Sequence, residues 1–270
     1  MNEQVLRLRQ GEPLKLDIQG REHLQHSHHD LMLESAATSF QVHLQTPLAQ
    51  AASHYNASKI VSAPLIAIAA NSPYLFDHEL WDESRIPLFE QAVEVSPNPE
   101  KTNSPHHRVT FGDAYLDNSM LECFQRNLND YEVVLPLPFD GSEHNLEHLR
   151  LHNGTIWRWN RPLVGFDQQG RVQLRIEHRP LPAGPTIVDM IANATFYFGL
   201  CHALANQLGN AEQQLPFATA TTNFYQAAKL GLEANITWLD GKQHPVQRLI
   251  LEQLLPMAEQ GLIQLKIDPQ

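Results

Sequence analysis

The sequence predicts an α+β domain in which an antiparallel sheet forms a concave face that is packed with helices. Residues 38–45 alternate between apolar and polar side chains, as a half-buried strand does. Residues 155–166 and 171–179 indicate two more strands, and the short polar connection Asp167-Gln168-Gln169-Gly170 between them favours a hairpin. Segments with helical spacing lie between and after these strands, which is typical of the α+β class.

Several segments predict helices that pack against this sheet. Residues 48–70 are rich in Ala, Ile and Leu at helical spacing, with an expected kink at Pro64. A short helix is predicted over 84–92, where a serine stands at the N-cap position. Two later helices are predicted over 223–232 and 246–260.

The most hydrophobic stretch of the chain covers residues 187–208. It begins after Gly184-Pro185 with Thr186 three positions before Asp189, which resembles a capping box, and Gly209 is the expected end. Polar side chains interrupt the stretch and no basic residues flank it, so we expect no membrane span. Because the helix is apolar on every side, we expect it to lie almost wholly buried against the sheet.

The clearest loop covers residues 96–107, where three prolines stand among polar residues. Strand patterns resume beyond this loop and continue the same alternation. We therefore expect a surface excursion within one domain that covers residues 1–270.

The composition narrows the class of protein and its partners. A net charge of −11, from 19 basic and 30 acidic side chains, argues against a protein that neutralises nucleic-acid phosphates. Cys123 and Cys201 are too few for a disulfide framework, so we expect buried thiols and a cytoplasmic location. Residues 1–10 lack the apolar core of a signal peptide. We expect small-molecule partners, and the sequence leaves a homo-oligomer open.

Charged side chains share one face of the strand predicted over 171–179. Arg175, Glu177 and Arg179 alternate with apolar residues along it. A solvated sheet face is one interpretation. The other is a site for phosphate and carboxylate groups, which guanidinium groups bind bidentately while a glutamate holds a divalent cation. If the hairpin places Arg158 beside Arg175, the charge density favours the second interpretation.

Histidines recur every four residues at His144, His148 and His152, a spacing that would align three imidazoles on a helix as metal ligands. With 15 histidines in the chain, such clusters arise by chance, and Asn153-Gly154 ends any helix there. Solvated polar residues are the simpler interpretation, and a histidine-rich metal-binding domain is the alternative. The same holds for a second polar cluster, formed by His26, His28, His29 and Asp30.

Two early segments resemble elements of glutamate-cysteine ligases of the bacterial and plant types. The run Glu-Ser-Ala-Ala-Thr-Ser-Phe-Gln-Val-His-Leu-Gln over 34–45 contains a Thr-x-x-Gln-Val-x-Leu pattern with Gln41 and His43 at its polar positions. In that family such a strand lines the active site. The segment Ala-Ala-Asn-Ser-Pro over 69–73 contains Asn71 and resembles the family's helix-closing turn, with Arg85 in the place of an arginine that follows it.

Two later segments continue the resemblance. Arg-Ile-Glu-His-Arg over 175–179 is similar to the family's Arg/Tyr-x-Glu-x-Arg strand, in which the glutamate contacts a metal and the arginine contacts substrate or phosphate. Residues 223–234 resemble a late helix of the family, with Lys229 in the place of its usual arginine. The resemblance runs from the first predicted strand to the end of the chain, and it implies a glutamine synthetase/glutamate-cysteine ligase-like fold.

The resemblance also implies an activity: ATP- and Mg²⁺-dependent joining of a glutamate-type carboxylate to an amine through an acyl phosphate. The residues that it implies are Arg158, Arg175 and Arg179 for catalysis, Gln41, His43, Asn71 and Arg85 for substrate, Lys229 and Asn223 for the cofactor ATP, and Glu177 for the metal Mg²⁺.

One element of the family pattern is missing. Members normally begin with a strand that reads Gly-Ile/Val-Glu-x-Glu, whose glutamates help to hold magnesium, and residues 1–35 supply no such motif. The nearest candidate is Gly20-Arg21-Glu22. We therefore expect a chain that is N-terminally incomplete relative to the family or that has lost full catalytic power. The alternative function is a non-catalytic member that binds a nucleotide or amino acid, or a partner subunit of another ligase.

Overall fold

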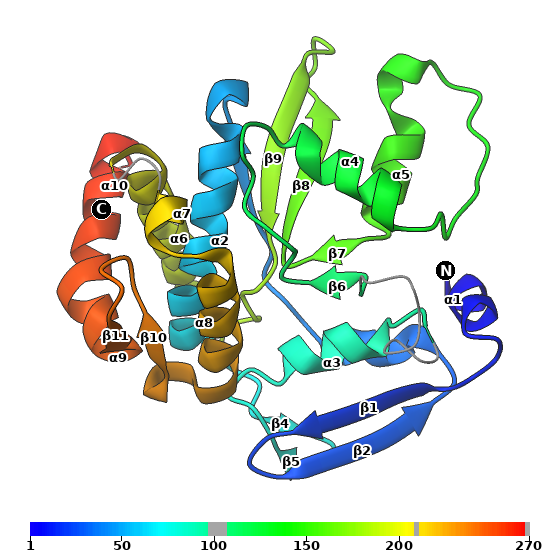
Figure 1. Ribbon diagram of the computed structural model, residues 1–270, viewed down its shortest axis with the longest axis horizontal. Helices are drawn as coiled ribbons and strands as arrows, with labels where there is room; N and C mark the ends of the chain where they lie inside the picture. Colours follow the sequence, from blue (N-terminus) through cyan, green and yellow to red (C-terminus); the bar gives the residue numbers. More distant parts are fainter. Residues whose placement is uncertain (97–106, 208–210, 268–270) are drawn as a thin grey trace.

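The computed structural model describes residues 1–96, 107–207 and 211–267. Within these ranges the protein is a mixed helix and sheet structure, in which several small sheets are present rather than one large sheet (Figure 1). Helices α2, α6, α8 and α10 lie together on one side of the molecule, and α4 and α5 lie on the other. This arrangement is compatible with the predicted α+β class. The predicted loop 96–107 and the helix end at Gly209 fall almost entirely outside the described residues.

The main sheet has three antiparallel strands in the order β3 (Val42–Thr46), β9 (Val172–His178) and β8 (Asn160–Phe166). The predicted hairpin is confirmed, because β8 and β9 are neighbours that pair antiparallel. The carboxylate of Asp167 shapes their connection by accepting hydrogen bonds from the backbone N–H groups of Gln169 and Arg171. β3 pairs with the other edge of β9, so this central strand is flanked on both sides.

Helix α2 (Ala51–Ala69) covers one face of this sheet and forms the centre of the hydrophobic core. It confirms the helix predicted over 48–70, and Pro64 lies inside it. The sheet side chains that face α2 are those of the even-numbered residues in β9, including Ile176 and His178, which are both fully buried. α6 (Ile187–Gln207) and α8 (Phe217–Leu230) pack against the other sides of α2. The opposite face of the sheet is left uncovered by α2.

Several polar side chains are buried between α2 and the sheet, where they hydrogen-bond to one another. Asn160 accepts hydrogen bonds from Ser58 Oγ at 2.7 Å and from His178 Nδ1 at 2.8 Å, and its own amide donates to Ser62 Oγ at 2.9 Å. Burial lowers the pKa of His178 to about 3, with the nearby charge of Arg85 acting in the same direction. His178 is therefore neutral, and this network ties β8 and β9 to α2.

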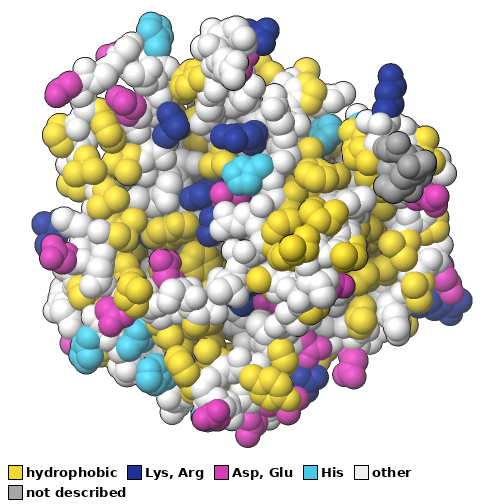
Figure 2. Space-filling model, turned by 180° about the vertical axis from the view of Figure 1, so that it is seen from behind, with side chains coloured by type: hydrophobic (Ala, Val, Ile, Leu, Met, Phe, Trp, Pro, Cys, Tyr) yellow, Lys and Arg dark blue, Asp and Glu magenta, His cyan; other side chains and the backbone are white. Residues whose placement is uncertain are grey.

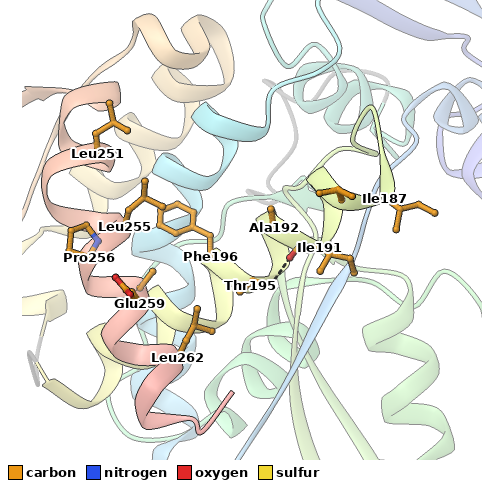
Figure 3. A pocket seen from close by; sticks show the side chains of 12 residues that line it. Ile187, Ile191, Ala192, Thr195, Phe196, Leu251, Leu255, Pro256, Glu259 and Leu262 are labelled. Atoms are coloured by element: carbon orange, nitrogen blue, oxygen red, sulfur yellow. Dashed lines mark hydrogen bonds between the residues drawn. The ribbon is translucent and has the colours of Figure 1, made fainter. Parts of the chain in front are cut away.

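Helix α6 is less buried than the sequence predicts. Its first turns expose Ile187, Val188 and Ile191, whose exposed fractions are 74, 77 and 56%. All three line a groove of about 790 Å³, and Figure 3 shows Ile187 and Ile191 on one side of it, with Leu251 and Leu255 on the other side. The prediction of an almost wholly buried helix is wrong for this half, because α2 and the C-terminal helices cover only the later turns. By length and composition alone, the stretch Ile187–Asn206 of this helix could cross a membrane, and 44% of it is buried inside the protein.

The later half of α6 packs closely on α10 (Leu255–Gln264). The two helices approach at Gly199 and Gly261, where the absence of a side chain lets the backbones touch. A Cβ atom on Gly199 would lie 2.2 Å from the carbonyl oxygen of Ala258, and one on Gly261 would lie 2.0 Å from that of Gly199. Glycine at both positions is therefore required for this helix crossing.

An N-terminal hairpin is present where the sequence indicated no strand. β1 (Leu14–Gln19) and β2 (His23–His28) pair antiparallel, and β1 alternates buried and exposed residues along its length. Leu16 and Ile18 point inward against α3 (Arg85–Ala92). The presence of α3 confirms the short helix predicted over 84–92. The polar cluster around His26 lies on β2 and the turn that follows it.

The remaining elements are short. The helix predicted over 223–232 corresponds to the second half of α8, which begins at Phe217. The helix predicted over 246–260 is divided into α9, η6 and the start of α10. The other elements are α1 (Asn2–Leu8), η1 (Leu31–Ala36), η2 (Leu48–Gln50), β4 (Tyr74–Leu75), β5 (His78–Glu79), β6 (Val109–Thr110), α4 (Leu121–Asp130), η4 (Glu143–Asn145), α5 (Glu147–Gly154), β7 (Trp157–Arg158), α7 (Ala211–Gln214), η5 (Gly231–Glu233), β10 (Asn235–Thr237), β11 (Gln243–Pro245), α9 (Val246–Leu249) and η6 (Ile250–Leu254).

Candidate functional site

The face of the sheet that α2 leaves uncovered carries a cluster of charged side chains centred on Glu177. The register of the sheet places His43 and Arg161 on either side of it. Arg161 Nε lies 2.7 Å from Glu177 Oε2, Arg179 Nη1 lies 3.0 Å from the same oxygen, and His43 Nε2 lies 3.5 Å from Oε1. In Figure 2, which shows the molecule from behind, basic, acidic and histidine side chains gather near the middle of the face.

The carboxylate of Glu177 is buried, with an exposed fraction of 4% for the residue. Burial acts to raise its pKa, but the hydrogen bond and charge of Arg161 and the charge of Arg179 outweigh burial, so the pKa lies below its ordinary value. Glu177 is therefore ionised at neutral pH. It fixes the positions of two guanidinium groups on this face, and one negative charge stands against two positive ones.

Arg175 lies two residues before Glu177 on the same face of β9, opposite Gln45 and Leu163. Its Nε is buried and has no hydrogen-bond partner among the described residues, and the same is true of Arg179 Nε. A buried donor without a partner carries a desolvation cost of about 1–3 kcal/mol. With Arg161, these residues place three guanidinium groups beside the carboxylate of Glu177, and this excess of positive charge is suited to bind phosphate or carboxylate.

The turn η1 adds a second carboxylate near this cluster. Burial raises the pKa of Glu34, while the positive charge of Arg179 acts against that rise, which indicates that the two groups lie close in space. Arg179 also packs over the ring of Phe89, with 5.6 Å between its guanidinium carbon and the ring centroid. The sequence did not single out Glu34 or Arg161; for Arg161, the strand alternation would have identified it had the hairpin register been known.

Arg158 does not join the cluster, which corrects the expectation that it lies beside Arg175. It belongs to β7, which leaves the sheet to pair with β6, and its guanidinium donates to Asn127 and packs over the ring of Tyr131. The hairpin register pairs Arg161 with Glu177, because the connection includes one residue more than predicted and β9 begins only at Val172. A shift of one residue moves each side chain to the other face of a sheet.

The predicted substrate residues are divided between two environments. Gln41 is exposed immediately before β3, two residues from His43 and on the same strand face, and its amide donates to Ser39 Oγ at 3.5 Å. Asn71 lies just after the end of α2, and its Nδ2 donates to the carbonyl oxygen of Ala183 at 3.1 Å. Arg85 is buried, pairs with Glu83 at 3.1 Å and donates to the carbonyl of Pro180. In these contacts Asn71 and Arg85 bind the protein itself.

The two residues predicted to bind ATP lie on α8. Asn223 Nδ2 donates to the carbonyl oxygen of Thr237 at 2.7 Å, and Asn223 Oδ1 accepts from the backbone N–H of Thr237 at 2.9 Å. Lys229 is exposed near the end of the helix. Among the described residues, neither of them has a hydrogen bond or ion pair with Glu177.

The residues of the cluster do not fit a magnesium site. Glu177 Oε2 already accepts from two guanidinium groups and Oε1 faces His43, whereas Mg²⁺ needs carboxylate oxygens that are free to coordinate it. Over residues 1–96, 107–207 and 211–267, no three His, Cys, Asp or Glu side chains gather in a way that could hold a metal ion. The histidine spacing gives no metal site either, because His144 lies in η4 and the left-handed Leu146 separates it from α5, which carries His148 and His152.

A polar cavity of about 580 Å³ lies where α3, β1 and α8 meet. Its lining includes Glu90, whose Oε1 accepts hydrogen bonds from Trp159 Nε1 and Tyr225 Oη, both at 2.8 Å. Burial raises the pKa of Glu90 to about 7, and these two hydrogen bonds only partly oppose the rise. No pattern in the sequence singles out this carboxyl, because one glutamate in a short helix is usually solvated.

Comparison with known protein families identifies the family of this chain. A model of glutamate-cysteine ligase family 2 matches residues 18–264, which is most of the chain. No curated protein matches the chain. The matched range includes the Glu177 cluster, the β8–β9 hairpin and the helices that pack on the sheet. The chain therefore belongs to glutamate-cysteine ligase family 2.

Proposed function

We propose that this protein is an ATP-dependent ligase that joins a glutamate-type carboxylate to an amine, and that Arg161, Arg175 and Arg179 hold the anionic groups of its substrates. Membership of the family implies carboxylate–amine ligase-like activity. One observation carries the proposal for this site: three arginines share one sheet face with the single carboxylate of Glu177, which two of them contact. Such an excess of guanidinium groups favours an anionic ligand.

The reaction chemistry makes use of a cationic face of this kind. The substrate carboxylate attacks the γ-phosphorus of ATP and ADP leaves; the amine then attacks the acyl carbon of the acyl phosphate, and phosphate leaves as the amide forms. Negative charge stays on the phosphoryl oxygens through both steps, so fixed cations beside them stabilise the transition states. In this proposal Arg175 and Arg179 contact the oxygens, and Glu177 positions Arg161 and Arg179.

A non-catalytic member that binds a nucleotide or an amino acid is the second candidate. The observation that favours it is the state of Glu177, whose oxygens are directed to Arg161, Arg179 and His43 rather than being free for Mg²⁺. In that case the arginine cluster would bind the same anions, and no amide would form. Mg²⁺ would then reach the protein only with the phosphates of its ligand.

The test combines binding with turnover. ATP and glutamate affinity are measured by calorimetry with and without Mg²⁺, and ADP release and amide formation are followed with a panel of amines. Arg175→Ala should weaken binding of ATP or glutamate about tenfold or more, as expected for loss of a charge-assisted hydrogen bond. The matched control is Arg171→Ala, because Arg171 is exposed at the tip of the same hairpin.

The outcomes separate the candidates. Turnover that Arg175→Ala reduces and Arg171→Ala leaves unchanged supports the ligase. Binding with the same sensitivity but without turnover supports the non-catalytic member. Binding of neither ATP nor glutamate, or equal effects of the two substitutions, would refute the assignment of this face.

We further propose small-molecule substrates as the partners of this protein and the cytoplasm as its location. Cys123 and Cys201 support the location, because both are buried free thiols.

A further inference from the structure

The polar cavity beside α3 contains the carboxyl of Glu90. Figure 1 shows α3 between β1 and β6, and Tyr225 of α8 completes the lining of the cavity. Its volume of about 580 Å³ lies within the usual range of small-molecule pockets. None of the residues that line it is a member of the Glu177 cluster, so this cavity is separate from the arginine face.

The two oxygens of the Glu90 carboxyl differ in their contacts. Oε1 accepts hydrogen bonds from Trp159 Nε1 and Tyr225 Oη, both at 2.8 Å, and these donors hold the group in place. Oε2 has no hydrogen bond with any described residue. It is not one of the fully buried polar atoms that lack a partner, so water can reach it. Because Glu90 lines the cavity, Oε2 is the oxygen that a ligand there can contact.

This carboxyl has the donors that an anion needs but lacks a counter-ion. Two donors directed at one oxygen favour the charged form of a carboxyl group. Burial outweighs them and raises the pKa of Glu90 to about 7. Within the described part of the chain, no Lys, Arg or His forms an ion pair with Glu90, and the nearby His107 pairs with Glu94 instead. A cation that entered the cavity would supply the missing partner.

The other carboxyl groups of the lining are already engaged. Both oxygens of Asp17 contact side chains of β2. Glu94 Oε1 accepts from the backbone N–H of Ser96 at 2.9 Å, and its Oε2 contacts His107. Of the three carboxyl groups in this lining, only that of Glu90 keeps an oxygen without a contact to a described residue.

The cations of the lining leave the carboxyl of Glu90 available to a charged ligand. The three side-chain nitrogens of Arg9 all donate to backbone carbonyl oxygens. Lys15 is exposed on β1, so solvent screens its repulsion of a cationic ligand. The carboxylate of Glu94 offsets the charge of His107.

We propose that this cavity binds a small organic ammonium ion, the protonated form of a primary amine, and that the ammonium group pairs with Oε2 of Glu90. The hydroxyl of Tyr225 offers a second acceptor, because it donates its own hydrogen to Glu90. When the ligand binds, Glu90 gives its proton to the solvent, because a cation favours the ionised carboxyl. The site does not depend on the ligase activity proposed for the arginine face.

The experiment uses two probes with the same carbon skeleton: benzylamine, which carries an ammonium group, and benzyl alcohol, which is neutral. Their dissociation constants are measured on the full chain by calorimetry at about pH 8, where Glu90 is mostly ionised. Benzylamine should bind about tenfold or more tightly, as expected for a charge-assisted hydrogen bond. Glu90→Gln should remove this preference and leave benzyl alcohol binding nearly unchanged. Asp17→Asn is the matched control and should keep the preference, because the contacts of Asp17 are made to β2.

Proton release is a second readout, which a merely structural role of Glu90 would not produce. At about pH 6 Glu90 is protonated, so benzylamine binding should release about one proton, whereas at about pH 8.5 it should release almost none. Calorimetry in two buffers of different ionisation enthalpy measures this release. His107 also titrates in this range, since its hydrogen bond with Glu94 raises its pKa. His107→Gln should therefore retain the release, and Glu90→Gln should abolish it.

Three results would overturn the proposal. Equal affinity of the wild type for the two probes, or a preference that Glu90→Gln retains, would remove the role of Glu90. An equal loss of the preference in Asp17→Asn and Glu90→Gln would show that the general charge of the surface attracts the amine. Failure of benzylamine to bind at millimolar concentration would exclude the cavity as an ammonium site. Thermal unfolding checks that each variant is folded, and the proton release of the wild type decides the matter if Glu90→Gln is not.

Discussion

The buried carboxyl of Glu90 makes a quantitative prediction about pH. Its pKa is raised from 4.5 to about 7 by burial, and Trp159 and Tyr225 both donate to its Oε1. The folded state therefore holds this proton up to about pH 7, whereas the unfolded state releases it near 4.5. The stability that the proton gives is complete below pH 4.5 and is lost as the pH rises through 7.

The size of the effect follows from the shift in pKa. A shift of about 2.5 units at roughly 1.4 kcal/mol per unit amounts to about 3 kcal/mol. In Glu90→Gln the amide cannot titrate, while its oxygen can still accept from Trp159 and Tyr225. The free energy of unfolding of Glu90→Gln relative to wild type should therefore increase by about 3 kcal/mol between acidic and alkaline pH.

Urea unfolding of both proteins at a series of pH values between 4 and 8 measures this difference, and other titrating groups cancel in the comparison. Glu252→Gln is the control, because Glu252 pairs with Arg248 on the surface, where an ion pair contributes less than about 1 kcal/mol. A difference between Glu90→Gln and wild type that stays constant over the whole pH range would refute the inference that burial keeps this carboxyl protonated.

Two further predictions concern packing and charge. Arg161→Ala should lower the free energy of unfolding by about 2 kcal/mol or more, because Glu177 stays buried with one partner fewer. Chemical unfolding measures this loss, and Arg171→Ala is the control, because Arg171 is exposed and its loss should cost less than about 1 kcal/mol. Equal costs of the two substitutions would contradict the account of the cluster. Gly199→Ala should destabilise the protein strongly, because the new Cβ atom would lie 2.2 Å from the carbonyl oxygen of Ala258. Gly154→Ala is the control and should be tolerated, because no atom lies within 4 Å of the position of its new Cβ atom. Similar thermal unfolding midpoints for the two variants would show that the α6–α10 contact is loose.

Several features of the fold could be predicted because their signals are local. Alternation over 171–179 placed Arg175, Glu177 and Arg179 on one face, and the structure confirms this placement. The helical spacing over 48–70 predicted α2 nearly to its ends. The polar connection at Asp167 predicted the β8–β9 hairpin. Each of these signals depends on the backbone period of one segment, which a sequence displays directly.

The composition of the site could not be predicted in the same way, because it depends on how segments meet. The register of β8 against β9 decided that Arg161, and not Arg158, contacts Glu177, and one additional residue in the turn was enough to change that. The burial of Glu90 depends on Trp159 and Tyr225, which lie far from it in the sequence. Contacts of this kind have no local pattern.

The sequence by itself determined which side chains share a face of a strand or helix, and with them the cationic character of β9. Only the tertiary structure decided which faces are covered: it left the first turns of α6 exposed, placed the unpredicted β1–β2 hairpin against α3, and turned the arginine face of the sheet away from α2. The physical reason is that periodicity is a property of one segment, whereas burial and pairing are properties of two segments that come together, and the same alternation is compatible with either face being covered.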